Sequence, residues 1–192
     1  MTSKLILIAG YAGNGKTHFG HLLARVYSAV YVDKDSVSRD FTEALLKSYG
    51  GSPHDRESET YIQKVRPLEY QEMMKVATEN LRLGKNVICS APFIKELNDP
   101  SWMTELEDSF ALMDVSIHVL WIHCDADTAK SRIEQRAAKR DKWKLNNWDS
   151  YIEANPHVVP EMSLPLYVID NKENPVEPLQ AQVKRFVNKL GD

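Results

Sequence analysis

Residues 10–17, Gly-Tyr-Ala-Gly-Asn-Gly-Lys-Thr, constrain the fold of this chain more than any other feature, because they fit the pattern G-x-x-x-x-G-K-T. The apolar residues 5–9 come directly before them, and a helical pattern begins at Lys16. A short, continuous apolar run bounded by a glycine turn is typical of a buried strand in a parallel sheet. The chain therefore opens with a strand, a glycine loop and a helix, which is the first unit of an α/β fold.

The glycine loop is suited to hold phosphate groups. Its glycines let the backbone approach phosphate oxygens closely, and the N-terminus of the following helix favours negative charge. Lys16 can neutralise the outer phosphates of a nucleotide, and Thr17 can ligate Mg²⁺. This Walker A pattern predicts binding of ATP or GTP. The nucleotide-binding residues predicted around the loop are Gly10, Ala12, Gly13, Asn14, Gly15, Lys16, Thr17 and His18. For His18, a surface or packing position remains an alternative.

Length, charge and hydropathy restrict the class of protein further. The chain of 192 residues suffices for one α/β domain, and we expect residues 1–192 to form a single domain. The formal net charge of -3 argues against a nucleic-acid partner. Because no apolar run approaches the roughly 18 residues of a membrane-spanning helix, we expect no membrane partner and a cytoplasmic protein. Cys89 and Cys124 lack the paired spacing of a zinc site, so we interpret both as reduced core residues. The sequence leaves the oligomeric state open.

Strand-like and helical patterns alternate along the rest of the chain. Strands are predicted at residues 4–9, 29–32, 86–90, 115–123 and 166–169. Helices are predicted at residues 16–28, 36–47, 67–83, 102–112, 127–142 and 176–190, the first with Leu22, Leu23 and Val26 on its inner face. Because parallel strands need crossover connections, this alternation predicts a five-stranded parallel sheet flanked by helices on both faces. Gly84 is suited to the left-handed conformation that ends a helix.

Two carboxylates follow the second predicted strand, in the segment Asp33-Lys34-Asp35. Carboxylates at the carboxyl end of a strand beside the phosphate loop face the crevice where open α/β sheets bind ligands. One of them could accept the proton of a hydroxyl group that attacks a phosphoryl group. A solvated acidic turn that caps the next helix is the alternative interpretation.

The third predicted strand ends in Cys89-Ser90-Ala91, without the Walker B aspartate of motor-type ATPases. Together with the glycine loop and the acidic segment, this ending resembles the small P-loop kinases of the shikimate kinase, gluconate kinase and nucleoside monophosphate kinase type. The resemblance extends, at the level of patterns, over roughly the whole chain. It implies a P-loop nucleoside triphosphate hydrolase fold with a helical lid. It also implies that Asp33 holds Mg²⁺ through water and that Asp35 meets the acceptor hydroxyl.

On the acceptor side, the resemblance points to an insertion at about residues 41–66 and to two further side chains. Ser90 is similar to the serine of the gluconate kinase turn and would line the acceptor pocket, unless it only shapes the turn. Arg66 begins an Arg-x-x-Glu segment that is similar to a shikimate kinase segment whose arginine binds the substrate carboxylate. A surface ion pair between Arg66 and Glu69 is the alternative.

A highly charged helical pattern follows the fourth predicted strand. Arg132, Arg136 and Arg140 recur at every fourth position and would share one helical face. In the related kinases an arginine-bearing segment closes over ATP, which implies a lid at about residues 130–150. Arg136 would contact the transferring phosphoryl group and Arg132 the region of the base, with a solvated helix laced by ion pairs to Asp127 and Glu134 as the alternative. Asn171 follows the last strand, where related kinases place a loop that touches adenine.

These patterns predict a kinase that uses ATP and Mg²⁺ and transfers the γ-phosphoryl group to a hydroxyl of a small molecule, such as a metabolite, a sugar acid or an antibiotic. Lys16, Asp35 and Arg136 are the predicted catalytic residues, and Asp35, Arg66 and Ser90 are predicted to bind the acceptor. Thr17 and Asp33 are the predicted metal-binding residues. A nucleotide or polynucleotide 5′-hydroxyl kinase and an ATP-binding regulatory or toxin-like protein are the alternative functions. The sequence does not identify the acceptor.

Overall fold

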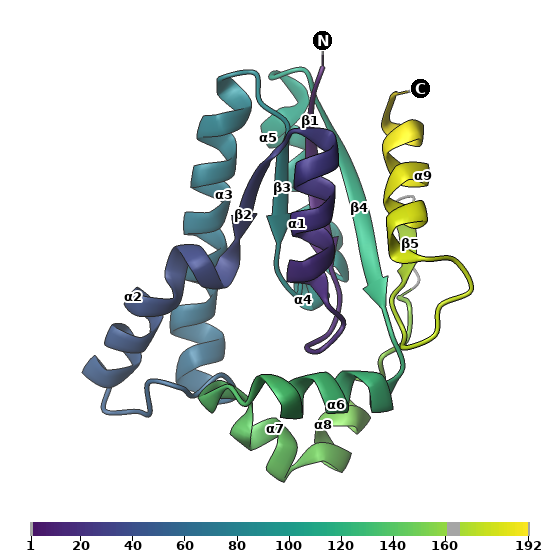
Figure 1. Cartoon of the computed structure of the whole chain (residues 1–192). Helices are drawn as coiled ribbons and strands as arrows, with labels where there is room; N and C mark the ends of the chain where they lie inside the picture. The colour runs from purple at the N-terminus through teal and green to yellow at the C-terminus, as the bar shows by residue number, and fades with distance from the viewer. Residues whose placement is uncertain (1, 161–165, 192) are drawn as a thin grey trace.

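Five strands form one parallel sheet in the computed structural model, which describes residues 2–160 and 166–191 (Figure 1). The strand order is β2-β3-β1-β4-β5, and each neighbouring pair is parallel. The predicted five-stranded parallel α/β sheet is therefore confirmed, with boundaries within two residues of those expected. The strands are β1 (Ser3–Ala9), β2 (Val30–Asp33), β3 (Val87–Ser90), β4 (Val115–His123) and β5 (Leu166–Asp170).

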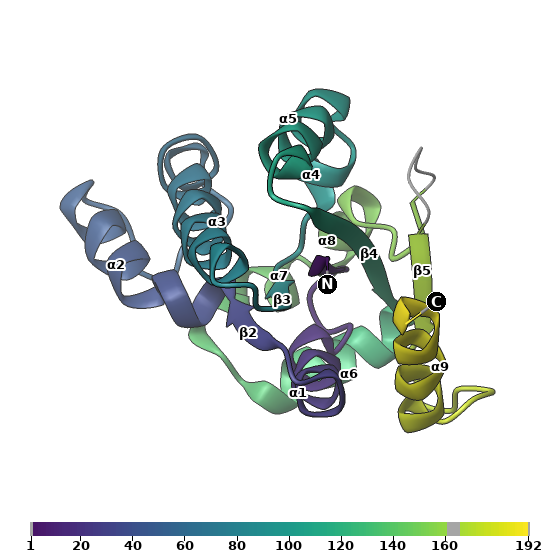
Figure 2. The ribbon, with the colours of Figure 1, turned by 90° about the horizontal axis from the view of Figure 1, so that it is seen from above.

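Helices cover both faces of the sheet, as the view in Figure 2 shows. One face packs against α1 (Lys16–Tyr27) and α9 (Leu179–Gly191), and the other against α3 (Arg66–Arg82) and α5 (Pro100–Ala111). The short helix α4 (Ile94–Leu97) leads from β3 into α5. Among the described residues, no helix combines the length and apolarity needed to cross a membrane.

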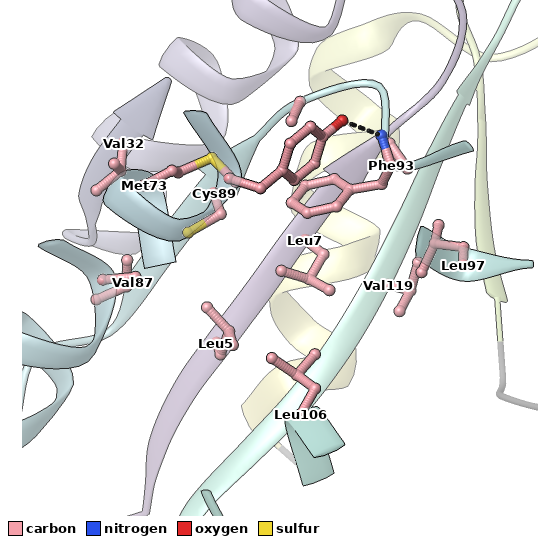
Figure 3. Close-up of a cluster of buried hydrophobic side chains, with 14 of the residues drawn as sticks. Leu5, Leu7, Val32, Met73, Val87, Cys89, Phe93, Leu97, Leu106 and Val119 are labelled. Atoms are coloured by element: carbon pink, nitrogen blue, oxygen red, sulfur yellow. Dashed lines mark hydrogen bonds between the residues drawn. The ribbon is translucent and has the colours of Figure 1, made fainter. Parts of the chain in front are cut away.

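The central strand β1 divides the core into two clusters. Leu5 and Leu7 face the α3 and α5 side, whereas Ile6 and Ile8 face the α1 and α9 side, and all four are fully buried. A strand buried on both faces needs a continuous apolar sequence, which explains the pattern before the glycine loop. Figure 3 shows the first cluster, in which the backbone N–H of Phe93 donates a hydrogen bond to the Tyr70 hydroxyl (3.2 Å). This bond ties α3 to the turn that follows β3.

The inner face of α1 differs from the expectation at one position. Val26 is 52% exposed, and the buried residues of this helix are Phe19, Gly20 and Leu23. The ring of Tyr31 packs directly on Gly20, where a Cβ atom would collide with it. The buried face of α1 is therefore centred on Phe19 and Leu23, about one turn before Val26.

The segment predicted as the acceptor insertion, at about residues 41–66, contains the second half of α2 (Lys34–Ser48) and ends in a π-helical turn, η1 (Tyr61–Val65), that runs directly into α3. Pro67 has no N–H to donate to the preceding turn, and the Arg66 N–H bonds instead to the Tyr61 carbonyl five residues earlier. The predicted helix at residues 67–83 is thus confirmed, but its approach is a wider turn. Gly84 has the expected positive φ of 71°.

The predicted helix at residues 127–142 is wrong in its second half. Helix α6 (Ala126–Arg136) ends at Ala137, which has a φ of 47°, and three short helices follow. They are η2 (Lys139–Asp141), α7 (Lys142–Asn146) and α8 (Trp148–Ala154). The buried Asp141 accepts two hydrogen bonds from Arg136, which folds the chain back after α6. Arg140 therefore does not continue the face of Arg132 and Arg136. The segment lies across the carboxyl ends of the strands (Figure 1).

Candidate active site

A cavity of about 330 Å³ lies where the glycine loop, the start of α2, the insertion and the helices α7 and α8 meet. Clefts at the carboxyl ends of parallel strands are the usual ligand sites of open α/β sheets. Most of the side chains predicted for the site line this one cavity. They are Ala12, Lys16, Thr17, Asp33, Asp35, Arg66, Ser90 and Arg136.

The glycine loop requires glycine where its backbone passes other elements. Gly13 has a φ of 83°, and a Cβ atom there would lie 2.6 Å from the carbonyl oxygen of Ala129 in α6. Gly15 has a φ of 86° and packs against the side chain of Asn171. An L side chain is strained at either position, both by conformation and by the contact. The Walker A glycines thus also bring α6 and the loop after β5 against the phosphate loop.

Asn14 and Asn171 hold the loop in place. The buried Asn14 donates from Nδ2 to the carbonyl of Ile122 (2.6 Å), and the Cys124 thiol donates to its Oδ1 (3.3 Å). Asn171 Nδ2 donates to the Asn14 carbonyl (2.7 Å), so its side chain lies on the phosphate loop itself. A contact between Asn171 and adenine stays a prediction. Both cysteines are free and buried, as expected.

The ammonium group of Lys16 is held against the backbone of the glycine loop. Its Nζ donates to the carbonyls of Gly10 (2.8 Å) and Tyr11 (2.9 Å). Burial, followed by the positive charge of Arg136, lowers the pKa of Lys16 to about 8. The side chain is therefore protonated at neutral pH but weakly solvated, and phosphate oxygens could replace its two carbonyl acceptors.

Asp33 caps α2 and also contacts Thr17 beside the phosphate loop. Its Oδ1 accepts the N–H of Ser36 (3.2 Å) and caps α2, as the alternative interpretation proposed. Its Oδ2 accepts from the hydroxyls of Tyr31 (3.1 Å) and Thr17 (3.5 Å). Thr17 and Asp33 thus present hard oxygen atoms side by side beside the phosphate loop. These donors fit Mg²⁺, which takes few protein ligands and completes its shell with phosphate and water.

Asp35 lies in the first turn of α2 and is surrounded by cations. Its carboxylate is 2.9 Å from Arg140 Nη2, 3.4 Å from Lys34 Nζ and 3.9 Å from Arg39 Nη2. Burial alone would raise the pKa of this carboxyl, but the charges of Lys34, Arg140 and Arg39 outweigh burial and lower it below its usual value. Asp35 is therefore ionised at neutral pH and able to accept a hydrogen bond from a hydroxyl group.

A buried carboxylate, Glu69, organises the wall behind Asp35. Its Oε2 accepts from Lys34 Nζ (2.7 Å) and the Tyr61 hydroxyl (2.7 Å), and its Oε1 from the hydroxyls of Thr42 (2.7 Å) and Ser38 (3.3 Å). Glu69 is only 3% exposed, so these four donors satisfy a charge that would otherwise be costly to bury. This cluster joins α2, η1 and α3, and sequence spacing gave no sign of it.

Arg66 has a different partner from the one considered. It pairs through two hydrogen bonds with Glu96, one of them 2.9 Å long, and packs 4.5 Å from the ring centroid of Tyr70. The alternative of an ion pair with Glu69 is therefore wrong. Glu96 is 30 residues away and compensates the charge of Arg66. Binding of an acceptor anion by Arg66 stays a prediction, and it would require competition with Glu96.

The three arginines after β4 reach the site by separate routes. Arg132 points back to the glycine loop and approaches the Gly13 carbonyl (3.5 Å). Arg136 pairs with Asp141 rather than with Glu134, and Arg140 pairs with Asp35. The expectation of one shared face is wrong for Arg140, yet the break in α6 brings this side chain into the cavity.

Two further side chains complete the inventory of predicted residues. Ser90 is 2% exposed, and its hydroxyl has no hydrogen-bond partner among the described residues, although it lines the cavity. His18 is exposed at the start of α1, and its contact with a nucleotide stays a prediction.

His157 was not predicted and packs behind the glycine loop. It is 3% exposed and stacks on Tyr11 with 4.8 Å between ring centroids. Burial is the main cause that lowers the pKa of His157 to about 4, and the nearby charge of Lys16 adds to it. The imidazole is therefore neutral at physiological pH.

We expect the melting temperature to fall as the pH is lowered from about 6.5 to about 4. Above this range His157 is neutral in both the folded and the unfolded chain. Within it, the unfolded chain binds a proton that the folded protein excludes, so acid favours unfolding. Melting curves should show a larger decrease for the wild type than for His157→Phe, whose ring does not titrate. Equal decreases in the two proteins would show that His157 is not responsible.

Comparisons with known structures show the same architecture. A protein from Chloroflexus aurantiacus, provisionally described as a kinase, is similar with a TM-score of 0.72 and 19% identity, covering 98% of each chain. A gluconokinase from Sinorhizobium meliloti has a TM-score of 0.56 at 14% identity, covering 99% of this chain and 97% of its own. The APS kinase of Mycobacterium tuberculosis, solved with AMPPNP and APS, has a TM-score of 0.60 at 16% identity, covering 100% and 99%. These likenesses establish the fold of the small P-loop kinases.

At the level of sequence, no curated protein matches the chain significantly. A family model described as an AAA domain matches residues 5–155, from β1 through the glycine loop to the end of α8. Because this match spans well over half of the chain and includes the phosphate loop, the protein belongs to the AAA domain family, with the fold of the small P-loop kinases.

Proposed function

We propose that the protein is an ATP-dependent kinase that transfers the γ-phosphoryl group to a hydroxyl of a small molecule. One observation carries the proposal: a single cavity runs from Lys16 and Thr17 at the phosphate loop to the ionised carboxylate of Asp35 and the polar wall behind it. A phosphoryl donor and a hydroxyl acceptor could meet there, which is the main requirement of phosphoryl transfer.

In this proposal, each part of the cavity has one task. Lys16 and Arg136 neutralise charge on the phosphates. Thr17 and Asp33 would hold Mg²⁺, which supplies further positive charge to the outer phosphates when it is bound with ATP. Asp35 accepts the proton of the acceptor hydroxyl, and the oxygen of that hydroxyl forms the new bond to γ-phosphorus. The bond from γ-phosphorus to the bridging oxygen breaks, and ADP leaves with that oxygen.

The helices α6, α7 and α8 would act as the lid predicted at about residues 130–150, and the insertion at about residues 41–66 would contact the acceptor. Lys144 in α7 pairs with Glu57 in the insertion (2.6 Å), and Arg140 pairs with Asp35 (2.9 Å). These ion pairs hold the two sides together across the cavity. Closure of this kind excludes water from the transferring phosphoryl group.

Coupled ADP release tests the proposal directly. We expect one class of hydroxylated compound to raise ADP release with ATP and Mg²⁺ well above background, in a panel of sugars, sugar acids, aminoglycosides, nucleosides, nucleoside monophosphates and 5′-hydroxyl oligonucleotides. Stimulation only by nucleotides or oligonucleotides would show that the acceptor is a nucleotide or a polynucleotide rather than a metabolite. Tight ATP binding with no stimulated turnover by any compound would count against a kinase.

A further inference from the structure

Arg56 lines the cavity at the insertion, and its guanidinium is fixed in one orientation. Its Nη1 donates to the backbone carbonyls of Pro53 (3.0 Å) and Asp55 (2.8 Å). Both hydrogens of Nη1 are thereby used, whereas Nε–H and the two Nη2–H groups have no hydrogen bond to the described residues. The group also packs over the ring of Tyr61, 5.3 Å from its centroid, and Tyr61 is itself anchored to Glu69.

Arg56 differs from the other arginines of the cavity in its charge balance. Arg66, Arg136 and Arg140 each have a carboxylate partner, which are Glu96, Asp141 and Asp35 respectively. Among residues 2–160 and 166–191, Arg56 forms no ion pair. The two acidic residues next to it in sequence make their short contacts with other groups: the Asp55 carboxylate accepts backbone N–H groups (2.9 and 3.0 Å), and Glu57 pairs with Lys144 (2.6 Å). Burial raises the pKa of Asp55, but those hydrogen bonds and, after them, the charge of Arg56 lower it below its usual value.

The free edge of Arg56 has the geometry that binds an oxyanion. In the same protein, Arg136 uses its Nε and Nη2 to hold both oxygens of Asp141, at 2.6 and 2.9 Å. This two-point contact is the preferred way in which arginine binds carboxylate and phosphate groups. Ser90 adds a second polar group without a partner, since its buried hydroxyl lines the same cavity.

From these observations we infer that Arg56, rather than Arg66, binds an anionic group of the acceptor, so that the acceptor is a small hydroxylated molecule bearing a carboxylate or phosphate. The inference rests on the proposed function, because only a kinase has an acceptor. Binding of the anion, and its dependence on Arg56, can nevertheless be measured without turnover. Because two carbonyls and an aromatic ring already orient the guanidinium, little side-chain freedom is lost when the anion binds.

Calorimetric titration with matched compounds tests the inference. The protein is first saturated with AMPPNP and Mg²⁺, so that added anions do not occupy the phosphate loop. D-gluconate is compared with D-glucitol, and D-glucose 6-phosphate with D-glucose, because each pair differs in its anionic group. We expect the anionic member of at least one pair to bind about 10-fold more tightly, and Arg56→Gln to abolish this preference. Arg56→Lys should retain part of it, and Arg25→Gln, on the exposed side of α1, should retain all of it.

Several results would overturn the inference. They are equal binding of charged and neutral compounds, absence of binding by every anionic compound, and a preference that survives Arg56→Gln. Loss of the preference only in Arg66→Gln would place the anchor at Arg66. Parallel assays of ADP release separate this inference from the proposed function. Phosphorylation of neutral compounds alone would support the kinase function and contradict the role of Arg56. Arg56-dependent binding without turnover would support the role of Arg56 and contradict the kinase function.

Discussion

Replacement of Lys16 by alanine is expected to lower kcat/KM for ATP by about 10³-fold or more, while the protein remains folded. The ammonium group is half-buried at the glycine loop, where burial lowers its pKa to about 8, so its charge is only partly screened by solvent. Phosphate oxygens would gain more from this cation than the carbonyls of Gly10 and Tyr11 do. Removal of the side chain would therefore remove the positive charge that lies directly at the phosphate loop.

Steady-state kinetics and melting curves of Lys16→Ala would check this result, with Lys47→Ala as the control. Lys47 lies exposed in the last turn of α2, so this control removes one lysine far from the loop. The affinity of the wild type for ATP should also weaken as the pH rises through about 8, because Lys16 of the empty protein then loses its proton. Wild-type kinetics in a folded Lys16→Ala protein would remove the loop from the mechanism.

Asp35→Asn is expected to lower kcat by about 10²- to 10⁴-fold with little change in the KM for ATP. The variant keeps the shape of the side chain but loses the charge that accepts the hydroxyl proton. Since Lys34 and Arg140 hold Asp35 ionised, the wild type presents the proposed base in its charged form at neutral pH.

The control for this prediction is Asp40→Asn, which removes an exposed carboxylate from the same helix. Its kinetics should match those of the wild type. If Asp35→Asn weakens ATP binding and leaves kcat intact, the carboxylate belongs with Mg²⁺ and the nucleotide rather than with the acceptor. Stimulated ADP release at the wild-type rate in Asp35→Asn would exclude it as the base.

The parts of the fold that sequence predicted are those with local causes. The apolar run of β1, the glycine loop and the position of Gly84 each follow from the chemistry of neighbouring residues, and all are present. The break after Arg136 could not be predicted, because the residue with positive φ there is Ala137 and not a glycine or asparagine, which usually mark such a position. That break depends on a buried ion pair with Asp141, which only the folded chain brings together.

The parts of the site that sequence missed depend on distant partners. Arg66 and Arg56 look alike in the sequence, and only the fold gives Glu96 to the first and leaves the second with backbone and aromatic contacts. Lys34 lies between the two predicted aspartates but reaches Glu69, 35 residues away. Periodicity and motifs describe one segment at a time, so they cannot show which charges are neutralised across segments.

The hydrogen bonds to Glu69 define where the acceptor segment could be exchanged in protein engineering. Residues 49–60 contribute none of its four donors, whereas Tyr61 contributes one (2.7 Å). A graft that stops before Tyr61 would replace the proposed acceptor contacts, including that of Arg56, and leave this buried carboxylate satisfied. A graft that replaced Tyr61 with phenylalanine would remove a donor at a cost of about 1–3 kcal/mol. If the proposed function is correct, the segment before Tyr61 could therefore be exchanged as a unit to redesign acceptor specificity, with its C-terminal boundary set by this tyrosine.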